Sequence, residues 1–98
     1  MSIALDPYVL DTLMADLVGH DRQPSAFLVY LYFVRHTSAA GKQTVTVALL
    51  DIAESTGLSK RTVQNAISWL VHRKLVAVTR PAATAVPTYR PLRPWRRS

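Results

Sequence analysis

The chain has no cysteine, only three glycines and no long apolar run among its 98 residues. Without cysteine it can form neither a disulfide nor a thiolate zinc site, and it has no cysteine nucleophile. The three glycines lie too far apart for a glycine-rich phosphate loop. The longest apolar run, residues 26–34, has nine members, whereas a membrane-spanning helix needs about 20. These absences exclude several chemistries and a membrane span.

Metal-binding and acid–base patterns are missing as well. The three histidines, His20, His36 and His72, lie far apart, and none belongs to a metal-ligand motif. Asp51 and Glu54 are three residues apart near the start of a predicted helix, where the helix dipole stabilises acidic side chains. We therefore expect no enzymatic activity, no cofactor and no metal.

Positive charge is what the sequence does have, and it is unevenly distributed. The chain has twelve Lys and Arg residues and six Asp and Glu residues, which gives a net charge of +6. Residues 1–34 are acidic, with four aspartates against Arg22 alone, whereas residues 35–98 carry eleven basic side chains against two acids. This asymmetry indicates a polyanionic partner for the latter two thirds. Since the N-terminus lacks the basic start of a secretory signal, we expect a cytoplasmic protein.

Apolar spacing predicts four helices, at about 7–18, 24–37, 47–56 and 59–74. Asp6 and Pro7 suit the start of the first helix, and Gly19 suits a left-handed stop. Thr46 is a possible cap of the third helix, and Ser59 is the expected cap of the fourth. Residues 26–34 are apolar on every side, so the second helix is either the central core helix or partly covered by a partner.

Short β-branched segments predict strands at about 43–45, 76–79 and 88–90. Prolines at both ends of residues 81–87 delimit a loop between the last two strands and limit edge pairing. The predicted fold class is mainly α with a small antiparallel sheet. One domain covers residues 1–90, and a basic, Pro/Arg-rich tail, expected to be extended or disordered, covers residues 91–98.

The most informative segment is residues 49–70. Ala53, Gly57 and Val63 stand at the spacing of a helix-turn-helix. A small side chain at 53 lets the second helix cross closely, and a glycine at 57 permits the positive φ of a short turn. Leu58, Val63 and Ile67 are expected to pack against the first helix of the pair and to fix the crossing angle.

With the capping serine and the following hairpin, this segment resembles the winged helix-turn-helix family of small bacterial transcription regulators, of the GntR- and MarR-like kind. The matching segments are residues 49–53, 57–63 and 75–76, together with Ile67 and Leu70. The resemblance covers about residues 24–90. It implies a nucleoid-associated bacterial protein that binds duplex DNA, with helix 59–74 in the major groove and the hairpin loop as a wing. Similar modules occur in replication initiators and in protein-interaction modules, and both remain alternatives.

Helical periodicity selects the side chains that would contact DNA. If Val63, Ala66 and Leu70 face inward, the first turns present four candidate base readers: Arg61, Thr62, Gln64 and Asn65. A polar stripe is usually a solvated face. However, Lys60 and Arg61 lie in the first turn, where the helix dipole disfavours positive charge, and this favours a role in binding an anion.

A second group of side chains is predicted to contact phosphates or the groove rim. Its members are Ser59, Lys60, Ser68, His72, Arg73, Arg80, Arg90, Arg93, Arg96 and Arg97. Arg80 and Arg90 flank the wing and are expected to lie close together across the hairpin. Trp69 is expected to face the wing and to serve in packing. For the tail arginines and for Arg73, solvated or structural roles remain alternatives.

The first helix suggests a homodimer. Its predicted apolar stripe exceeds what a three-helix winged core needs to cover, and symmetric dimers match paired DNA half-sites. The stripe consists of Val9, Leu10, Leu13, Met14 and Leu17. The alternative is that this helix packs only on its own domain.

Overall fold

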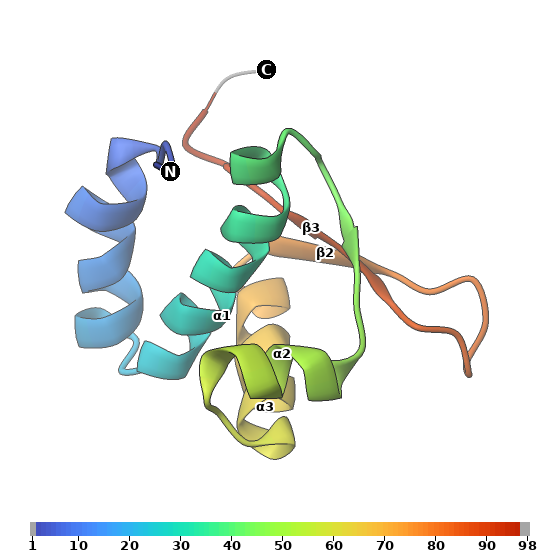
Figure 1. The fold of residues 1–98 in the computed structure, drawn as a ribbon. Coiled ribbons are helices and arrows are strands. Elements are labelled where there is room, and N and C mark those ends of the chain that lie inside the picture. The colour runs from blue at the N-terminus through green and yellow to red at the C-terminus, as the bar shows by residue number, and fades with distance from the viewer. Residues whose placement is uncertain (1, 97–98) are drawn as a thin grey trace.

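A computed structural model describes residues 2–96, and it shows a mainly helical fold with a small three-stranded antiparallel sheet (Figure 1). The main helices are α1 (Pro24–His36), α2 (Leu49–Thr56) and α3 (Lys60–His72). The strands are β1 (Val45–Thr46), β2 (Val76–Thr79) and β3 (Thr88–Pro91). The predicted fold class is therefore confirmed. None of the helices described is long and apolar enough to cross a membrane.

The N-terminal helix (residues 7–20) is mostly π-helical, in the segments η1 (Val9–Leu13) and η2 (Ala15–His20). It begins as predicted, since the Tyr8 N–H donates to the Asp6 carboxylate at 3.1 Å. The prediction that Gly19 ends it in a left-handed conformation is wrong. The helix continues to His20, and the first residue of positive φ is Arg22, at 56°. The side-chain bonds of Asp21 described below hold the chain in place beyond Gly19.

The N-terminal helix buries a narrower face than predicted. Val9, Leu13 and Leu17, which are four residues apart, all lie in the core. These three side chains are not available to a second copy, which corrects the predicted dimer stripe. Leu10 and Met14 remain 45% and 41% exposed, and Val18 joins them at 40%.

Helix α1 is the central core helix. Its buried side chains point to several sides: Ala26, Phe27, Val29, Tyr30, Phe33 and Val34. The Phe33 ring stacks on Tyr89 of β3 with 4.8 Å between the ring centres, which joins the helical layer to the sheet. Leu28 is the exception, since it is 45% exposed. The apolar run 26–34 is thus explained almost entirely by the chain's own core.

The turn between α2 and α3 has the predicted geometry. Gly57 adopts φ 79°, a conformation that glycine reaches without steric cost. Ser59 caps α3 by accepting a hydrogen bond from the Thr62 N–H at 3.1 Å. The prediction that Thr46 caps α2 is wrong. Thr46 lies in β1, and its hydroxyl forms a hydrogen bond with the Thr88 hydroxyl at 2.7 Å. Helix α2 starts after Ala48 without a side-chain cap.

The sheet has the order β1-β3-β2, with both pairings antiparallel. Strand β1 begins two residues later than predicted, at Val45, and β3 extends one residue further, to Pro91. The register pairs Val78 with Tyr89 and Ala77 with Arg90. Beyond these pairs the β2–β3 hairpin extends as a long loop away from the helices, on the right of Figure 1. This arrangement of a helix-turn-helix followed by a hairpin is that of a winged helix.

The first residues of the tail fold back onto the domain, so the prediction of an extended or disordered tail is wrong for them. The Leu92 N–H donates to the Leu75 carbonyl at 2.7 Å. Trp95 stacks on Tyr8 with 4.4 Å between the ring centres. The gain from burying this indole against a second ring offsets the cost of ordering the segment. Residues 97–98 lie outside the described part, and so does the predicted contact of Arg97.

Candidate nucleic-acid interface

Helix α3 has one apolar face and one polar face, as predicted. Val63, Ala66 and Leu70 are fully buried, and Ile67 is 9% exposed. The opposite face consists of exposed side chains that can donate or accept hydrogen bonds: Lys60, Arg61, Gln64, Asn65, Ser68 and His72. Because the buried face fixes the rotation of the helix, these side chains are presented together on one surface.

The first turn of α3 concentrates positive charge where the helix dipole opposes it. Lys60 and Arg61 are both exposed, and neither takes part in the ion pairs formed within residues 2–96. Thr62 differs from the other candidate readers because it is half-buried and its Oγ1 already accepts a bond from Ser59 Oγ at 2.9 Å. The turn therefore offers two free cations beside a capped helix start.

The opposite end of α3 is tied to the N-terminal helix through Asp21. The Trp69 indole N–H donates to one carboxylate oxygen at 2.9 Å, and Arg73 donates to the other at 3.0 Å. Burial acts to raise the pKa of Asp21. The hydrogen bonds from His20 and Trp69 and the charge of Arg73 outweigh it, so that the pKa lies below its usual value. Trp69 thus packs toward the N-terminal helix, and the prediction that it faces the wing is wrong.

The wing arginines do not lie opposite each other across the hairpin. Arg90 pairs with Ala77, whereas Arg80 comes three residues later, just past the end of β2 at Thr79. The prediction that the two arginines lie close together is therefore wrong, because the register displaces them along the hairpin by roughly 10 Å. Arg80 also donates to the Ala83 carbonyl at 3.4 Å, and the loop tip 82–86 carries no basic residue.

The tail arginines lie away from the first turn of α3. In Figure 1 the tail runs beside the N-terminus at the top, whereas α3 begins at the bottom. Asp6 accepts the Trp95 indole N–H at 3.0 Å and the Arg96 Nε–H at 2.7 Å. The bond from Trp95 is the main reason that the pKa of Asp6 is lowered, with smaller contributions from Tyr8 and Arg96. Arg93 is exposed and joins none of the ion pairs formed within residues 2–96.

Two features of this surface leave no local signal in the sequence. Asp21 is 48 residues from Trp69, and nothing in the local pattern distinguishes it from the other aspartates of the first helix. Lys42 lies just before β1 and was not singled out, yet it lines a cavity together with the tail arginines. Within the described residues no group of three or more His, Cys, Asp or Glu side chains could hold a metal ion.

Comparison with known proteins agrees with this geometry. A family model described as a helix-turn-helix domain matches residues 23–76, more than half of the chain. The match extends from α1 to the first residue of β2 and includes the whole of α2 and α3. Searches of curated proteins and of solved structures gave no significant match.

Proposed function

The chain belongs to the helix-turn-helix domain family, and on that basis we propose that it is a transcriptional regulator that binds duplex DNA at specific sequences. Membership of this family indicates DNA binding. The regulatory role, and a kinship with GntR- and MarR-like regulators in the bacterial cytoplasm, are the finer parts of the proposal. The observation that carries it is the exposed polar face of α3 with two free cations in its first turn.

Helix α3 would lie in the major groove with its first turns deepest. Arg61 has the geometry to bond guanine through two nitrogens, and Gln64 and Asn65 are suited to adenine. Thr62 would contribute through its methyl group, because its hydroxyl serves the Ser59 cap. Ser59, Lys60, Ser68 and His72 would contact the backbone around the same groove.

The wing would add phosphate contacts on one side. Arg80 and Arg90 are offset by three residues along the hairpin, so they would meet different phosphates. Since the loop tip has no cation, the wing would follow the backbone and would not enter the minor groove deeply. Most of the affinity would come from phosphate contacts and would therefore fall with salt.

Selection from a random duplex library followed by titration tests this proposal. Arg61→Ala should weaken binding to the selected site by about 1–3 kcal/mol and weaken binding to unrelated DNA less. Arg35→Ala, which removes an exposed arginine from α1, is the matched control and should change neither affinity. Equal losses on both duplexes would contradict base reading by Arg61.

The alternatives give different results. A protein-interaction module would select no sequence and would bind DNA weakly at both low and high salt. A replication initiator would select a sequence but would leave unchanged a reporter whose promoter overlaps the selected site. A regulator should alter the expression of that reporter.

We also propose that two copies associate through the outer face of the N-terminal helix. Leu10, Met14 and Val18 are exposed and lie four residues apart, so they are neighbours along one side of the helix. An antiparallel pairing of two such helices, centred on Met14, would bring the exposed apolar side chains of both copies together and remove them from water. Because such an apolar line is complementary to itself, it favours a second copy as the occupant.

Sedimentation at tens of micromolar protein tests the association. We expect a dimer for the unmodified chain and a monomer for Met14→Glu. Leu50→Glu introduces the same charge at an exposed leucine of α2 and should leave the dimer intact. A monomeric unmodified chain would refute the proposal.

A further inference from the structure

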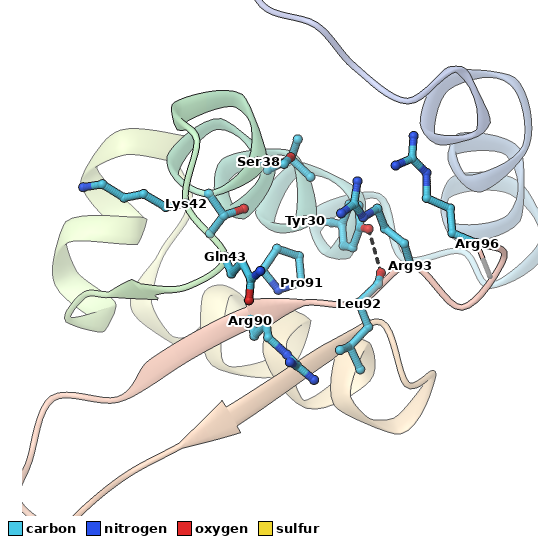
Figure 2. Close-up of a pocket in the computed structure, with 11 residues that line it drawn as sticks. Tyr30, Ser38, Lys42, Gln43, Arg90, Pro91, Leu92, Arg93 and Arg96 are labelled. Atoms are coloured by element: carbon cyan, nitrogen blue, oxygen red, sulfur yellow. Dashed lines mark hydrogen bonds between the residues drawn. The ribbon is translucent and has the colours of Figure 1, made fainter. Parts of the chain in front are cut away.

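A cavity of about 490 Å³ lies at the end of the molecule opposite the first turn of α3 (Figure 2). Its walls come from the end of α1, the segment before β1, the end of β3 and the chain that follows it. Figure 2 shows Arg93 and Arg96 on one side, beside the Tyr30 hydroxyl, and Lys42 and Gln43 on the other. Sites for small molecules typically have this size, about 300–1,000 Å³.

The polar part of the lining is strongly basic. Its charged side chains are Lys42, Arg90, Arg93 and Arg96, all of them exposed, and no acidic side chain lines this cavity. Arg93 has no ion-pair partner within the described residues, and Arg96 uses its Nε for Asp6. Gathering like charges costs free energy, and a bound anion would offset that cost.

The floor of the cavity is largely apolar. Val34 is 7% exposed and Tyr30 is 1% exposed, and Pro91 lies next to them. The Tyr30 hydroxyl donates to the Leu92 carbonyl at 2.9 Å, which fixes the backbone next to Arg93. Burial raises the pKa of Tyr30 to about 12, so the phenol stays neutral and keeps this bond.

We propose that this cavity binds a small organic anion, with a carboxylate or phosphate group held by Arg93 and Arg96 and an apolar, ring-sized body against Val34, Tyr30 and Pro91. The combination of cations at the rim and an apolar floor is what distinguishes it from a simple phosphate contact. Its distance from the start of α3 sets it apart from the proposed DNA surface (Figure 1). The site does not depend on the proposed function, since it can be tested without DNA.

Amide chemical shifts of the full chain provide the test, with phenyl phosphate and benzoate as probes. We expect saturable shifts at Ser38, Gln43 and Arg93 for at least one of them, and the one that binds identifies the preferred acid group. Arg93→Gln should weaken that binding about tenfold, the value of one charge-assisted hydrogen bond. Arg35→Gln removes a positive charge outside the cavity and should bind as the unmodified chain does.

Four results would overturn the proposal. Equal binding of benzyl alcohol would show that the cations are not used, and equal binding of inorganic phosphate would show that the apolar floor is not used. Equal affinities of Arg93→Gln and Arg35→Gln would remove Arg93 from the site. A salt slope of DNA binding that falls by about one in Arg93→Gln would make this residue a DNA phosphate contact.

Discussion

The two ends of helix α3 carry arginines in opposite situations. At the start, Arg61 is exposed and joins no ion pair within residues 2–96. Just past the end, Arg73 donates to Asp21, whose side chain is 3% exposed. Both residues belong to the same basic stretch of sequence, yet only the first has its charge available for a partner. A count of basic residues therefore overstates the anion-binding surface, because part of the charge is neutralised within the fold.

The largest effect should follow from removing the acceptor at the end of the N-terminal helix. Asp21→Ala leaves the Trp69 indole N–H and the Arg73 guanidinium without their partner, so we expect the free energy of unfolding to fall by about 2–4 kcal/mol. Asp11→Ala, at an exposed position of the same helix, is the control and should be nearly neutral. Urea unfolding measures both. Equal losses in the two variants would show that Asp21 is not a special contact.

The direct contrast is between Arg61→Ala and Arg73→Ala. The first should reduce DNA affinity by about 1–3 kcal/mol at the selected site and leave the free energy of unfolding unchanged. The second should leave DNA affinity unchanged and lower the free energy of unfolding by about 1 kcal/mol, because its ion pair with Asp21 is partly exposed. DNA titration and urea unfolding of both variants would test this exchange. A loss of DNA affinity in folded Arg73→Ala would assign Arg73 to the interface.

Lowering the pH should reduce the stabilisation provided by Asp21, but by less than Asp21→Ala does. The pKa of Asp21 is lower in the folded chain than its usual 3.8, so the unfolded chain takes up the proton first as the pH falls. The stabilisation is complete above about pH 4–5 and is lost as the pH falls through the folded pKa. A protonated carboxyl still accepts hydrogen bonds, which limits the loss. Below pH 4 the free energy of unfolding should therefore fall less steeply with decreasing pH for Asp21→Ala than for the unmodified chain. Equal slopes would contradict Asp21 as the origin of this pH dependence.

The smallest effect should come from the ion pair between Asp6 and Arg96, at the start of the N-terminal helix. The Arg96 side chain is 54% exposed, so Arg96→Gln should cost only about 0–1 kcal/mol of stability. Arg93→Gln, which breaks no ion pair, is the matched control. Urea unfolding of the two variants should give nearly equal values. A loss as large as that of Asp21→Ala would mean that the tail holds the helix as firmly as Asp21 does.

Local patterns were sufficient to predict the helix-turn-helix and its buried face. Gly57 and Ser59 act within a few residues, and the spacing of Val63, Ala66 and Leu70 directly sets which side of α3 is buried. The same reasoning failed for Trp69, because its rotation toward Asp21 depends on a contact across 48 residues. It also misjudged the N-terminal helix. The expected stripe included five side chains, whereas the domain covers only the line of Val9, Leu13 and Leu17 and leaves Leu10 and Met14 outside.

The cavity could not be predicted, since Lys42 and Arg93 come to line one cavity only through the packing of β3 beside the end of α1. The wing arginines show a related limit. Both arginines flank the hairpin loop in the sequence, which suggested proximity, but the strand register, which depends on the loop between them, pairs Arg90 with Ala77, three residues before Arg80.

The bond between Asp6 and Trp95 joins residues 89 positions apart and so brings nearly the whole chain into one closed loop. Closing a loop costs entropy that grows with the logarithm of its length, so this contact is among the most expensive to form before the rest of the chain is ordered. We therefore expect the N-terminal helix to dock at its start only after α1 and the sheet have assembled. Connecting the two ends of the chain by a short linker would make this contact local, and the chain could then be opened at the wing loop with its core contacts retained.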